Sequence, residues 1–494
     1  MSTLNNPMAL LKAMLARIPL ILKTLVFHGL QITPASKKQD LRTEMTVAII
    51  RSFLDMSVSV STQQRKSMND PGIKGPMWIS KVTLPAPEDA VAAAVLDVVK
   101  TLSEGDEAKM IVMPPVKPVE AEWTGYRGGV DKNAPLPDIS EKEKYEALKV
   151  EAKSDLVIFY IHGGALYLMD PCTHRVPVAY ICKLTGARAL NVRYRLAPQN
   201  PFPAALVDIL TAYLSLIHPP EGSYHEPIPA DKIIFAGDSA GGNLSLALLQ
   251  TLLTLKRTSS TVQFHCREVS IDLPVGISLI SPWCDITRSM SSVRDNAIYD
   301  YLAPPPHEPA ETMYHPATNT PDSIWPTNPP RSDLYCNARL VAHPLVSPLA
   351  CPKELWKGSP PIYIAVGEEG LTDEDLITAR KIHHAGVPVI VEQYEGMPHV
   401  FGFIMIGTAA GKLFFQGWAQ YLRDVLAKSI QPARGDVGKV IFHHAGWHST
   451  KVISLDDVHS LSDAEVEKIL RDSRDHRAEW ESKLNEEWQA KARL

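Results

Sequence analysis

Ile233-Ile234-Phe235-Ala236-Gly237-Asp238-Ser239-Ala240-Gly241-Gly242-Asn243 is the stretch that decides the fold of this 494-residue chain. Its first half is an apolar, β-prone run, which is typical of a buried parallel strand. A Gly-x-Ser-x-Gly turn follows and opens directly into residues 244–253, which form a helical pattern that is apolar on nearly every side. Strand, tight turn and buried helix are the context of a nucleophile elbow, which would expose the Ser239 hydroxyl above the sheet.

Two glycines of this turn have a predicted steric role. A Cβ at Gly237 or Gly241 would collide where helix and strand approach each other. Gly-x-Ser-x-Gly is nevertheless a short motif, and an ordinary glycine-rich turn between a strand and a helix is the alternative. The interpretation therefore depends on whether the chain also supplies a base, an acid and an oxyanion hole.

The surrounding chain alternates apolar strand patterns with helical ones. Strands are predicted at residues 156–161, 187–192, 232–237, 275–280, 361–366 and 387–394, and helices between them at 203–217, 374–385 and 407–428. This alternation predicts an α/β fold with a mainly parallel sheet covered by helices on both faces. The loops after the strand C-termini should carry the chemistry.

A general base is predicted after the last core strand, where the chain reads Tyr394-Glu395-Gly396-Met397-Pro398-His399. A serine hydroxyl is a weak nucleophile until a base takes its proton. His399 is the histidine at the end of a predicted strand after the elbow, although a loop histidine without such a role is the alternative.

The acid should follow the preceding strand, where several carboxylates compete. Glu369 lies in the loop at the strand end and is the preferred candidate to orient the histidine. Asp373 and Glu374 resemble the first turn of a helix, where acidic residues are favoured by the helix dipole. The order serine, acid, histidine along the chain is that of a hydrolase.

An oxyanion hole is predicted from backbone amides. Gly163, Gly164 and Ala165 follow the 156–161 strand, so we expect their amides to point into the crevice, and the amide of Ala240 adds a donor beside the serine.

At this point the chain resembles the hormone-sensitive-lipase family of α/β-hydrolases. The resemblance covers about residues 156–403 and rests on His162-Gly163-Gly164-Ala165, Tyr194-Arg195-Leu196-Ala197-Pro198, Pro201-Phe202-Pro203-Ala204-Ala205, Gly237-Asp238-Ser239-Ala240-Gly241-Gly242, Ser281-Pro282-Trp283 and His399. The N-terminal region, with Asp40-Leu41-Arg42-Thr43-Glu44, more loosely resembles fungal members described as steryl-acetyl-hydrolase-like.

The resemblance implies an eight-stranded α/β-hydrolase core, an N-terminal helical cap and cleavage of carboxylic esters. The family's acid lies two residues before a leucine, which corresponds to Glu369 ahead of Leu371, a glutamate where aspartate is commoner. Ala165 replaces the third glycine of the family's His-Gly-Gly-Gly; its amide remains, but its methyl group narrows the space for bulky acyl or alcohol groups. His162 is a structural residue in this family.

The expected function is that of a serine carboxylesterase acting on apolar substrates, with a short acyl or acetyl ester, through an acyl-enzyme intermediate. An amidase or formamidase would use the same residues. A ligand-binding receptor on the same fold is a third reading, since plant gibberellin receptors resemble this family but lack the triad histidine. The presence of His399 favours the enzyme.

Residues 1–39 contain no acidic residue but carry Lys12, Arg17, Lys23, Lys37 and Lys38, with leucines and isoleucines at helical spacing. They suit an interfacial helix on a membrane, or a lid, and peripheral membrane contact is an expectation. A helix packed on the core is the alternative, and a cleaved transit peptide is another.

Three regions are predicted: a helical cap or interfacial region at 1–105, the catalytic core at 106–430 with a proline-rich loop at 301–330, and an accessory extension at 431–494. Residues 40–102 read as mostly helical, 110–113 and 119–123 as strand-like. In the extension, 440–442 and 452–455 could be short strands, and Ser462-Asp463-Ala464-Glu465 is a capping box that opens a helix to about residue 490.

Composition bears on partners and on the cellular compartment. A net charge of −5 gives no reason to expect nucleic-acid binding. Six scattered cysteines without a C-x-x-C pair indicate free thiols in a reducing, intracellular compartment, either cytoplasmic or associated with a membrane. His443, His444 and His448 lack a completing Cys or carboxylate at ligand spacing, so neither a metal nor a cofactor is expected.

Overall fold

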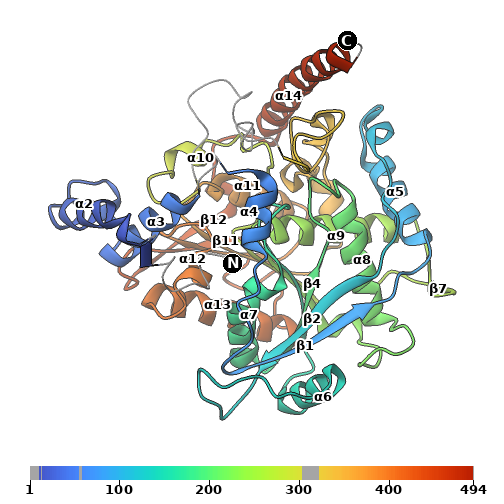
Figure 1. Ribbon diagram of the computed structural model, residues 1–494, viewed down its shortest axis with the longest axis horizontal. Coiled ribbons are helices and arrows are strands. Elements are labelled where there is room, and N and C mark those ends of the chain that lie inside the picture. Colours follow the sequence, from blue (N-terminus) through green and yellow to red (C-terminus); the bar gives the residue numbers. More distant parts are fainter. Residues whose placement is uncertain (1–10, 13, 55–57, 303–321, 493–494) are drawn as a thin grey trace.

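The computed structural model describes residues 11–12, 14–54, 58–302 and 322–492. Most of the proline-rich loop predicted at 301–330 lies outside these residues. Figure 1 shows a central twisted sheet flanked by helices on both sides.

The main sheet contains ten strands in the described part of the chain, in the order β1-β2-β4-β3-β5-β8-β9-β10-β11-β12. Their bounds are β1 Met77–Leu84, β2 Val119–Tyr126, β3 Val157–Ile161, β4 Arg188–Arg193, β5 Ile233–Asp238, β8 Gly276–Ile280, β9 Ile362–Gly367, β10 Val389–Tyr394, β11 Lys439–His443 and β12 Thr450–Ser454. In this spatial order, the strands from β4 through β3, β5, β8, β9 and β10 to β11 run parallel. At the two edges, β1, β2 and β12 pair antiparallel. The sheet has two strands more than the expected eight, and the two short strands predicted in the C-terminal extension continue it as β11 and β12.

Helices cover both faces because successive strand residues point to opposite sides. In β3, Val157, Phe159 and Ile161 join the core that includes α8 and α9, while Ile158 and Tyr160 join the core that includes α7 and α13. Helices in the body of the fold are α5 Ala90–Leu102, α6 Glu141–Glu151, α7 Pro171–Thr185, α8 Ala204–Ile217, α9 Ala240–Arg257, α10 Ser292–Asp295, α11 Thr372–His384, α12 Phe401–Ile404 and α13 Ala409–Leu426.

Two expectations for the N-terminal third were wrong. Residues 77–84 form β1 rather than part of a mostly helical region, and every residue of β1 pairs with β2. Of the residues predicted as strand-like at 110–113, the first ends a short 3-10 helix, Glu107–Met110, and the other three form no strand. Both errors have the same cause, since a strand exists only through a partner that is distant in sequence. The division into three regions stays a prediction.

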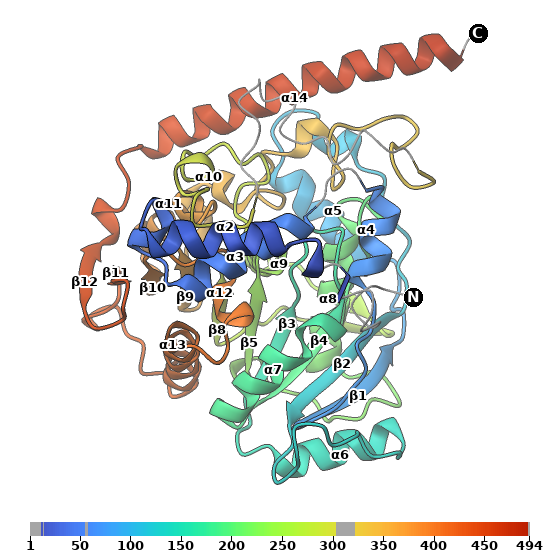
Figure 2. The same cartoon turned by 60° about the vertical axis from the view of Figure 1, so that its left-hand side comes forward.

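Three N-terminal helices lie outside the layers formed by the sheet and its covering helices (Figure 2): α2 Ile18–Gly29, α3 Leu41–Phe53 and α4 Val60–Ser67. At the other end of the chain, α14 Asp463–Ala492 runs along the top of the molecule, and its last turns project past the body. The predicted capping box opens it, since the Ser462 amide donates to Glu465 (2.8 Å) and the Glu465 amide to the Ser462 hydroxyl (3.3 Å).

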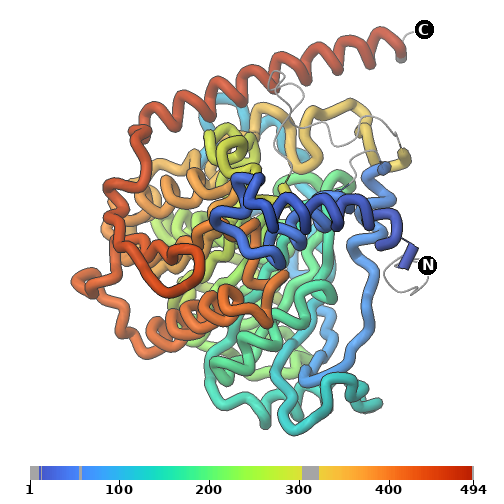
Figure 3. Tube along the Cα trace, turned by 90° about the vertical axis from the view of Figure 1, so that its left-hand side faces the viewer, coloured from blue at the N-terminus to red at the C-terminus, as the bar shows by residue number. Residues whose placement is uncertain are grey.

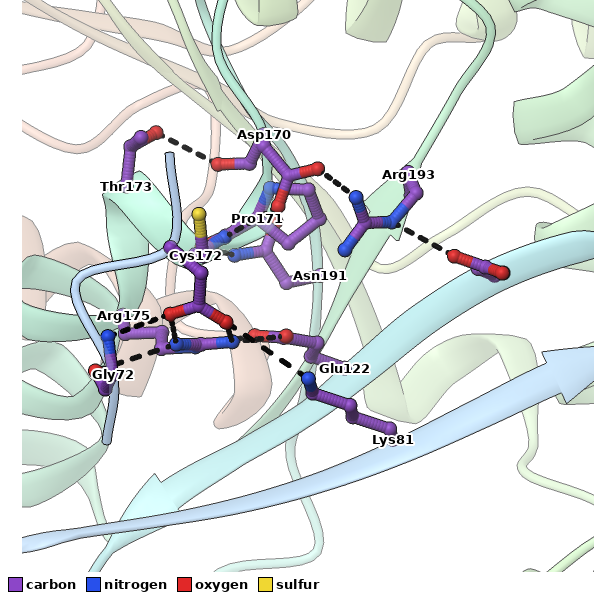
Figure 4. A network of polar contacts seen from close by, with 12 residues as sticks. Gly72, Lys81, Glu122, Asp170, Pro171, Cys172, Thr173, Arg175, Asn191 and Arg193 are labelled. Atoms are coloured by element: carbon purple, nitrogen blue, oxygen red, sulfur yellow. Dashed lines mark hydrogen bonds and ion pairs between the residues drawn. The ribbon is translucent and has the colours of Figure 1, made fainter. Parts of the chain in front are cut away.

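A buried arginine network fixes α7 against the sheet (Figure 4). The guanidinium of Arg175 donates to Glu122 of β2 (2.7 Å) and to Asp70 (2.6 Å), and its side chain is 2% exposed. Asp170 caps the start of α7 through the Cys172 amide and pairs with Arg193 of β4. These contacts set the position of α7. The residue before Arg175 in this helix is His174, which lies near Asp238 of β5.

Candidate functional site

Ser239 lies at the turn between β5 and α9 in a backbone conformation that few residues adopt. Its φ is +52° and its ψ is −120°, and its side chain is partly exposed while its neighbours are buried. The amide of Ser239 donates to the Ile280 carbonyl at the end of β8 (2.9 Å). This is the geometry of a nucleophile elbow, and the sequence predicted it.

The predicted steric role of the turn glycines is confirmed. A Cβ on Gly237 would lie 2.4 Å from the Gly241 carbonyl oxygen. One on Gly241 would lie 1.9 Å from the carbonyl oxygen of Ile161 in β3. Both positions therefore exclude any larger residue.

His399 and Glu369 are brought together from two different loops. Glu369 follows β9, His399 follows β10, and Nδ1 of the histidine lies 2.6 Å from Oε1 of the carboxylate. Burial alone would lower the pKa of His399, but the Glu369 carboxylate and its hydrogen bond, with Asp300 and Asp238 further away, raise it above its ordinary value. An imidazole held this way is a stronger base toward a proton arriving at Nε2.

The other oxygen of Glu369 is held by the loop after β8. The Ser281 hydroxyl donates to Oε2 (2.7 Å), and the Gly367 amide donates to the same oxygen (3.1 Å). Ser281 directly follows Ile280, whose carbonyl accepts the Ser239 amide. A short chain of contacts thus joins the serine turn to the carboxylate and, through it, to the histidine.

Asp373, the competing acid, lies elsewhere. Its carboxylate accepts hydrogen bonds from the Ser292 amide (2.8 Å) and the Ser291 hydroxyl (3.0 Å). Glu374 accepts from the amides of Cys284 and Asp285 and is fully buried. Both side chains therefore anchor neighbouring loops, and Glu369 is the acid that contacts His399.

Asp300 is a site residue that the sequence did not reveal. One carboxylate oxygen accepts the His399 amide (3.2 Å), and the other accepts the Gly370 amide (2.9 Å), so one buried side chain holds both loops. The ring of Tyr301 packs edge-on against the His399 ring, with centroids 6.0 Å apart. The hydrogen bonds of Asp300 to Gly370 and His399 join positions about 70 and 99 residues apart, and no local sequence pattern predicts them.

The predicted oxyanion loop needs one correction. The amide of Gly163 is not free, because it donates to the Asp238 carboxylate (3.1 Å). Within the described part of the chain, the amides of Gly164, Ala165 and Ala240 donate to no acceptor. Ala165 has a φ of +52°, which is unusual for a residue with a side chain. Three of the four predicted donors therefore stay available.

Asp238, the residue before the serine, organises this loop from behind. Its carboxylate accepts from the Tyr160 hydroxyl (2.6 Å) as well as from Gly163, and it faces Nε2 of His174 (3.3 Å). Burial would raise the pKa of Asp238, but His174 and the hydrogen bonds lower it below its usual range. Burial would lower the pKa of His174, and Asp238 raises it. This buried contact ties the loop to the serine turn.

His162 is buried, and among the described residues no carboxylate forms a hydrogen bond with its ring. Its Nδ1 lies 2.7 Å from the Gly163 carbonyl oxygen, and its ring stacks on Tyr194 at 4.3 Å between centroids. Burial, with the nearby His174, lowers the pKa of His162 to about 4. These contacts match the structural role that the resemblance implied for this residue.

Of the three histidines that the sequence analysis considered as metal ligands, His448 is exposed and the other two lie near carboxylates. His443 faces Glu392 at 3.2 Å and His444 faces Glu395 at 3.3 Å. Among the residues that the structure describes, no three His, Cys, Asp or Glu side chains are arranged to hold a metal ion.

Comparison with known proteins locates the similarity over the same residues. A family model described as an alpha/beta hydrolase fold matches residues 158–403. An esterase of Acinetobacter venetianus is 30% identical over 253 residues, which are 51% of this chain and 69% of that protein. An acetyl-hydrolase of Streptomyces hygroscopicus is 29% identical over 277 residues, which are 56% of this chain and 77% of that protein.

Solved structures show the same fold. A crystal structure of an esterase from the bacterial hormone-sensitive lipase family superposes with a TM-score of 0.51 at 23% sequence identity. The superposition covers 78% of this chain and 99% of that one.

Proposed function

Because this chain belongs to the hormone-sensitive-lipase-like family of α/β-hydrolases and is a carboxylic ester hydrolase, we propose that Ser239, His399 and Glu369 are its catalytic triad. The observation that carries the proposal is the 2.6 Å contact between His399 and Glu369, which is joined through Ser281 and Ile280 to the serine turn. The positioned pair supplies the base that a serine hydroxyl requires.

The reaction follows from these roles. The Ser239 hydroxyl attacks the ester carbonyl, and Nε2 of His399 takes its proton and later gives it to the leaving alcohol. The Glu369 carboxylate holds the imidazole in the tautomer that carries hydrogen on Nδ1 and stabilises the imidazolium. A water molecule, activated by the same histidine, then releases the acid from the acyl-enzyme.

The negative charge on the carbonyl oxygen would be met by the amides of Gly164, Ala165 and Ala240. Each such donor is typically worth about 3–4 kcal/mol of the barrier. Gly163 contributes indirectly, since its hydrogen bond to Asp238 sets the position of the two amides that follow it.

The proposed substrate is an ester with a short acyl group, acetyl being the reference case, on an apolar alcohol. Two observations support it: the relative named an acetyl-hydrolase, and the methyl group of Ala165 where the family carries glycine. A receptor function has less support, since His399 is present and paired with its acid.

A panel of p-nitrophenyl esters of increasing acyl length, with the matching aryl amides, tests the proposal. We expect acetyl and butyryl esters to be hydrolysed fastest and the amides to be poor substrates. Preference for amides would favour an amidase, and no turnover of either class would favour a binding protein.

A further inference from the structure

One side of α2, with the residues that flank the helix, faces away from the protein. Six apolar side chains on this side are 40–64% exposed: Ile18, Leu22, Leu25 and Val26 in the helix, Leu15 before it and Leu30 after it. Figure 3 shows α2 in blue, lying on the outer surface of the molecule. Exposed apolar residues are common singly, but a continuous stripe of this length marks an interaction surface.

Two polar side chains of the same segment, Arg17 and His28, contact α3 instead. Arg17 donates to the Ser52 carbonyl (2.9 Å) and lies over the Phe53 ring, both at the end of α3. Further along, Nδ1 of His28 lies 2.6 Å from the carboxylate of Glu44, also on α3. Helices of soluble proteins ordinarily turn their apolar stripe toward the core. Here hydrogen bonds and a cation–π contact attach the helix, and the apolar stripe is left for another contact.

Charge distinguishes among the occupants of this surface. Residues 1–39 hold five lysines and arginines and no acidic residue, although the whole chain has a net charge of −5. Lys12 and Lys23 are exposed beside the stripe. An apolar stripe flanked only by positive charge complements a bilayer with anionic headgroups. It does not complement a second copy of itself, since the same positive charges would face one another.

We propose that this face of α2 docks on the surface of an anionic lipid bilayer, with the helix lying in the plane of the interface. Leu15, Ile18, Leu22 and Leu25 would enter the boundary between headgroups and acyl chains, and Lys12 and Lys23 would contact phosphate groups. The described helices include none with both the length and the hydropathy that crossing a bilayer requires.

The docking surface is connected to the loops of the active site. Lys38 Nζ donates to Glu368 (2.5 Å), the residue before the triad acid. The Gln39 side chain donates to the carbonyls of Gly396 (2.7 Å) and Tyr299 (2.8 Å). Docking would therefore bring the end of the sheet that carries Glu369 and His399 toward the lipid, where apolar esters dissolve. Because of these contacts, removing residues 1–39 would disturb the site itself, and substitutions on the exposed stripe are the cleaner test.

The test uses the full chain and flotation with phosphatidylcholine vesicles that do or do not contain phosphatidylserine. Ile18→Ser, Leu22→Ser and Leu25→Ser are combined in one variant. The matched control combines Val112→Ser, Val150→Ser and Val452→Ser, whose side chains are 86%, 84% and 58% exposed away from α2. We expect the intact chain and the control to float with anionic vesicles, and the α2 variant to lose about tenfold or more of its binding.

Salt and enzyme assays complete the test. Added salt should weaken binding to anionic vesicles, since the Debye length falls to about 3 Å at 1 M. Hydrolysis of soluble p-nitrophenyl acetate should be the same in all three proteins, which separates a failure of docking from a failure of the proposed triad. The proposal is overturned if the intact chain does not bind anionic vesicles, or if the α2 variant binds as well as the control. It is also overturned if the α2 variant converts a dimer to a monomer in sedimentation, because a second copy would then cover the stripe.

Discussion

Nδ1 of His399 lies 2.6 Å from Oε1 of Glu369, and the two side chains are 5% and 0% exposed. A buried carboxylate is costly unless its oxygens are hydrogen-bonded, and here Ser281 and Gly367 donate to the second oxygen. Both carboxylate oxygens of Glu369 therefore have hydrogen-bond partners. The imidazole of His399 is the partner that carries a second nitrogen, Nε2, which can take part in proton transfer.

Replacing Glu369 by Gln should lower kcat by about 10⁴-fold, because the amide cannot stabilise an imidazolium and favours the wrong tautomer. Asp373→Asn is the matched control, since Asp373 binds Ser291 and Ser292 and does not contact His399. Steady-state kinetics on p-nitrophenyl acetate would rank the two. A larger loss in the Asp373 variant would reassign the acid.

Asp300→Asn should disturb both catalytic loops and the titration of the base. The asparagine has one acceptor oxygen for two amides, those of His399 and Gly370, so we expect kcat to fall by about 10- to 100-fold. His399 must be neutral to act as a base, and its pKa is raised, in part by Asp300. The acidic limb of the wild-type kcat/KM profile should thus lie above the ordinary histidine pKa of about 6.5.

In the Asp300→Asn variant the negative charge is gone, so the pKa of His399 falls and the acidic limb should move to lower pH. A role in loop stability alone would lower activity without moving that limb. An unchanged profile would therefore contradict the electrostatic effect of Asp300 on the pKa of His399.

Ala165→Gly should widen the range of substrates. Loss of the methyl group would admit bulkier esters, and one methylene in a pocket is worth about 10-fold or more in discrimination. The measurement is the ratio of kcat/KM for a branched acyl ester to that for the acetyl ester, which we expect to rise. If the ratio stays constant, the methyl group does not limit the pocket.

Glu122→Gln should destabilise the fold rather than the chemistry. Arg175 and Glu122 are each 2% exposed, and removing one partner of a buried pair typically costs about 3–5 kcal/mol. Asp70→Asn removes the other, 44% exposed partner of Arg175 and should cost much less. Urea unfolding monitored by tryptophan fluorescence gives both values, and equal losses would show that burial does not control the strength of this network.

The parts of the site that the sequence predicted all rest on local patterns. Ser239 lies in a five-residue motif between an apolar strand and an apolar helix, and each strand end marks the loop that carries Glu369 or His399. The contacts that organise these loops are different in kind. Asp300, His174 and Tyr160 reach the site from distant segments, so their roles depend on the packed structure and not on any spacing along the chain.

The N-terminal region shows the same limit for the fold. β1 was not predicted because its partner β2 begins 35 positions after β1 ends, and a strand pattern this short is ambiguous without that partner. The apolar stripe of α2 was visible as a periodicity, but a period does not tell which way the helix faces. The exposed fractions of its side chains, and the attachment of the helix to α3 through Arg17 and His28, show that the stripe points outward.

Covalent labelling of the nucleophile tests the central claim most directly. Ser239 lies at a strained turn with its side chain partly exposed, so a fluorophosphonate should react with its hydroxyl once His399 has taken the proton. Peptide mass spectrometry of the labelled protein should place a single adduct on Ser239, and Ser239→Ala should abolish both labelling and ester hydrolysis while keeping the wild-type circular dichroism spectrum. An adduct on another residue, or near-wild-type turnover by the Ser239→Ala protein, would contradict this account.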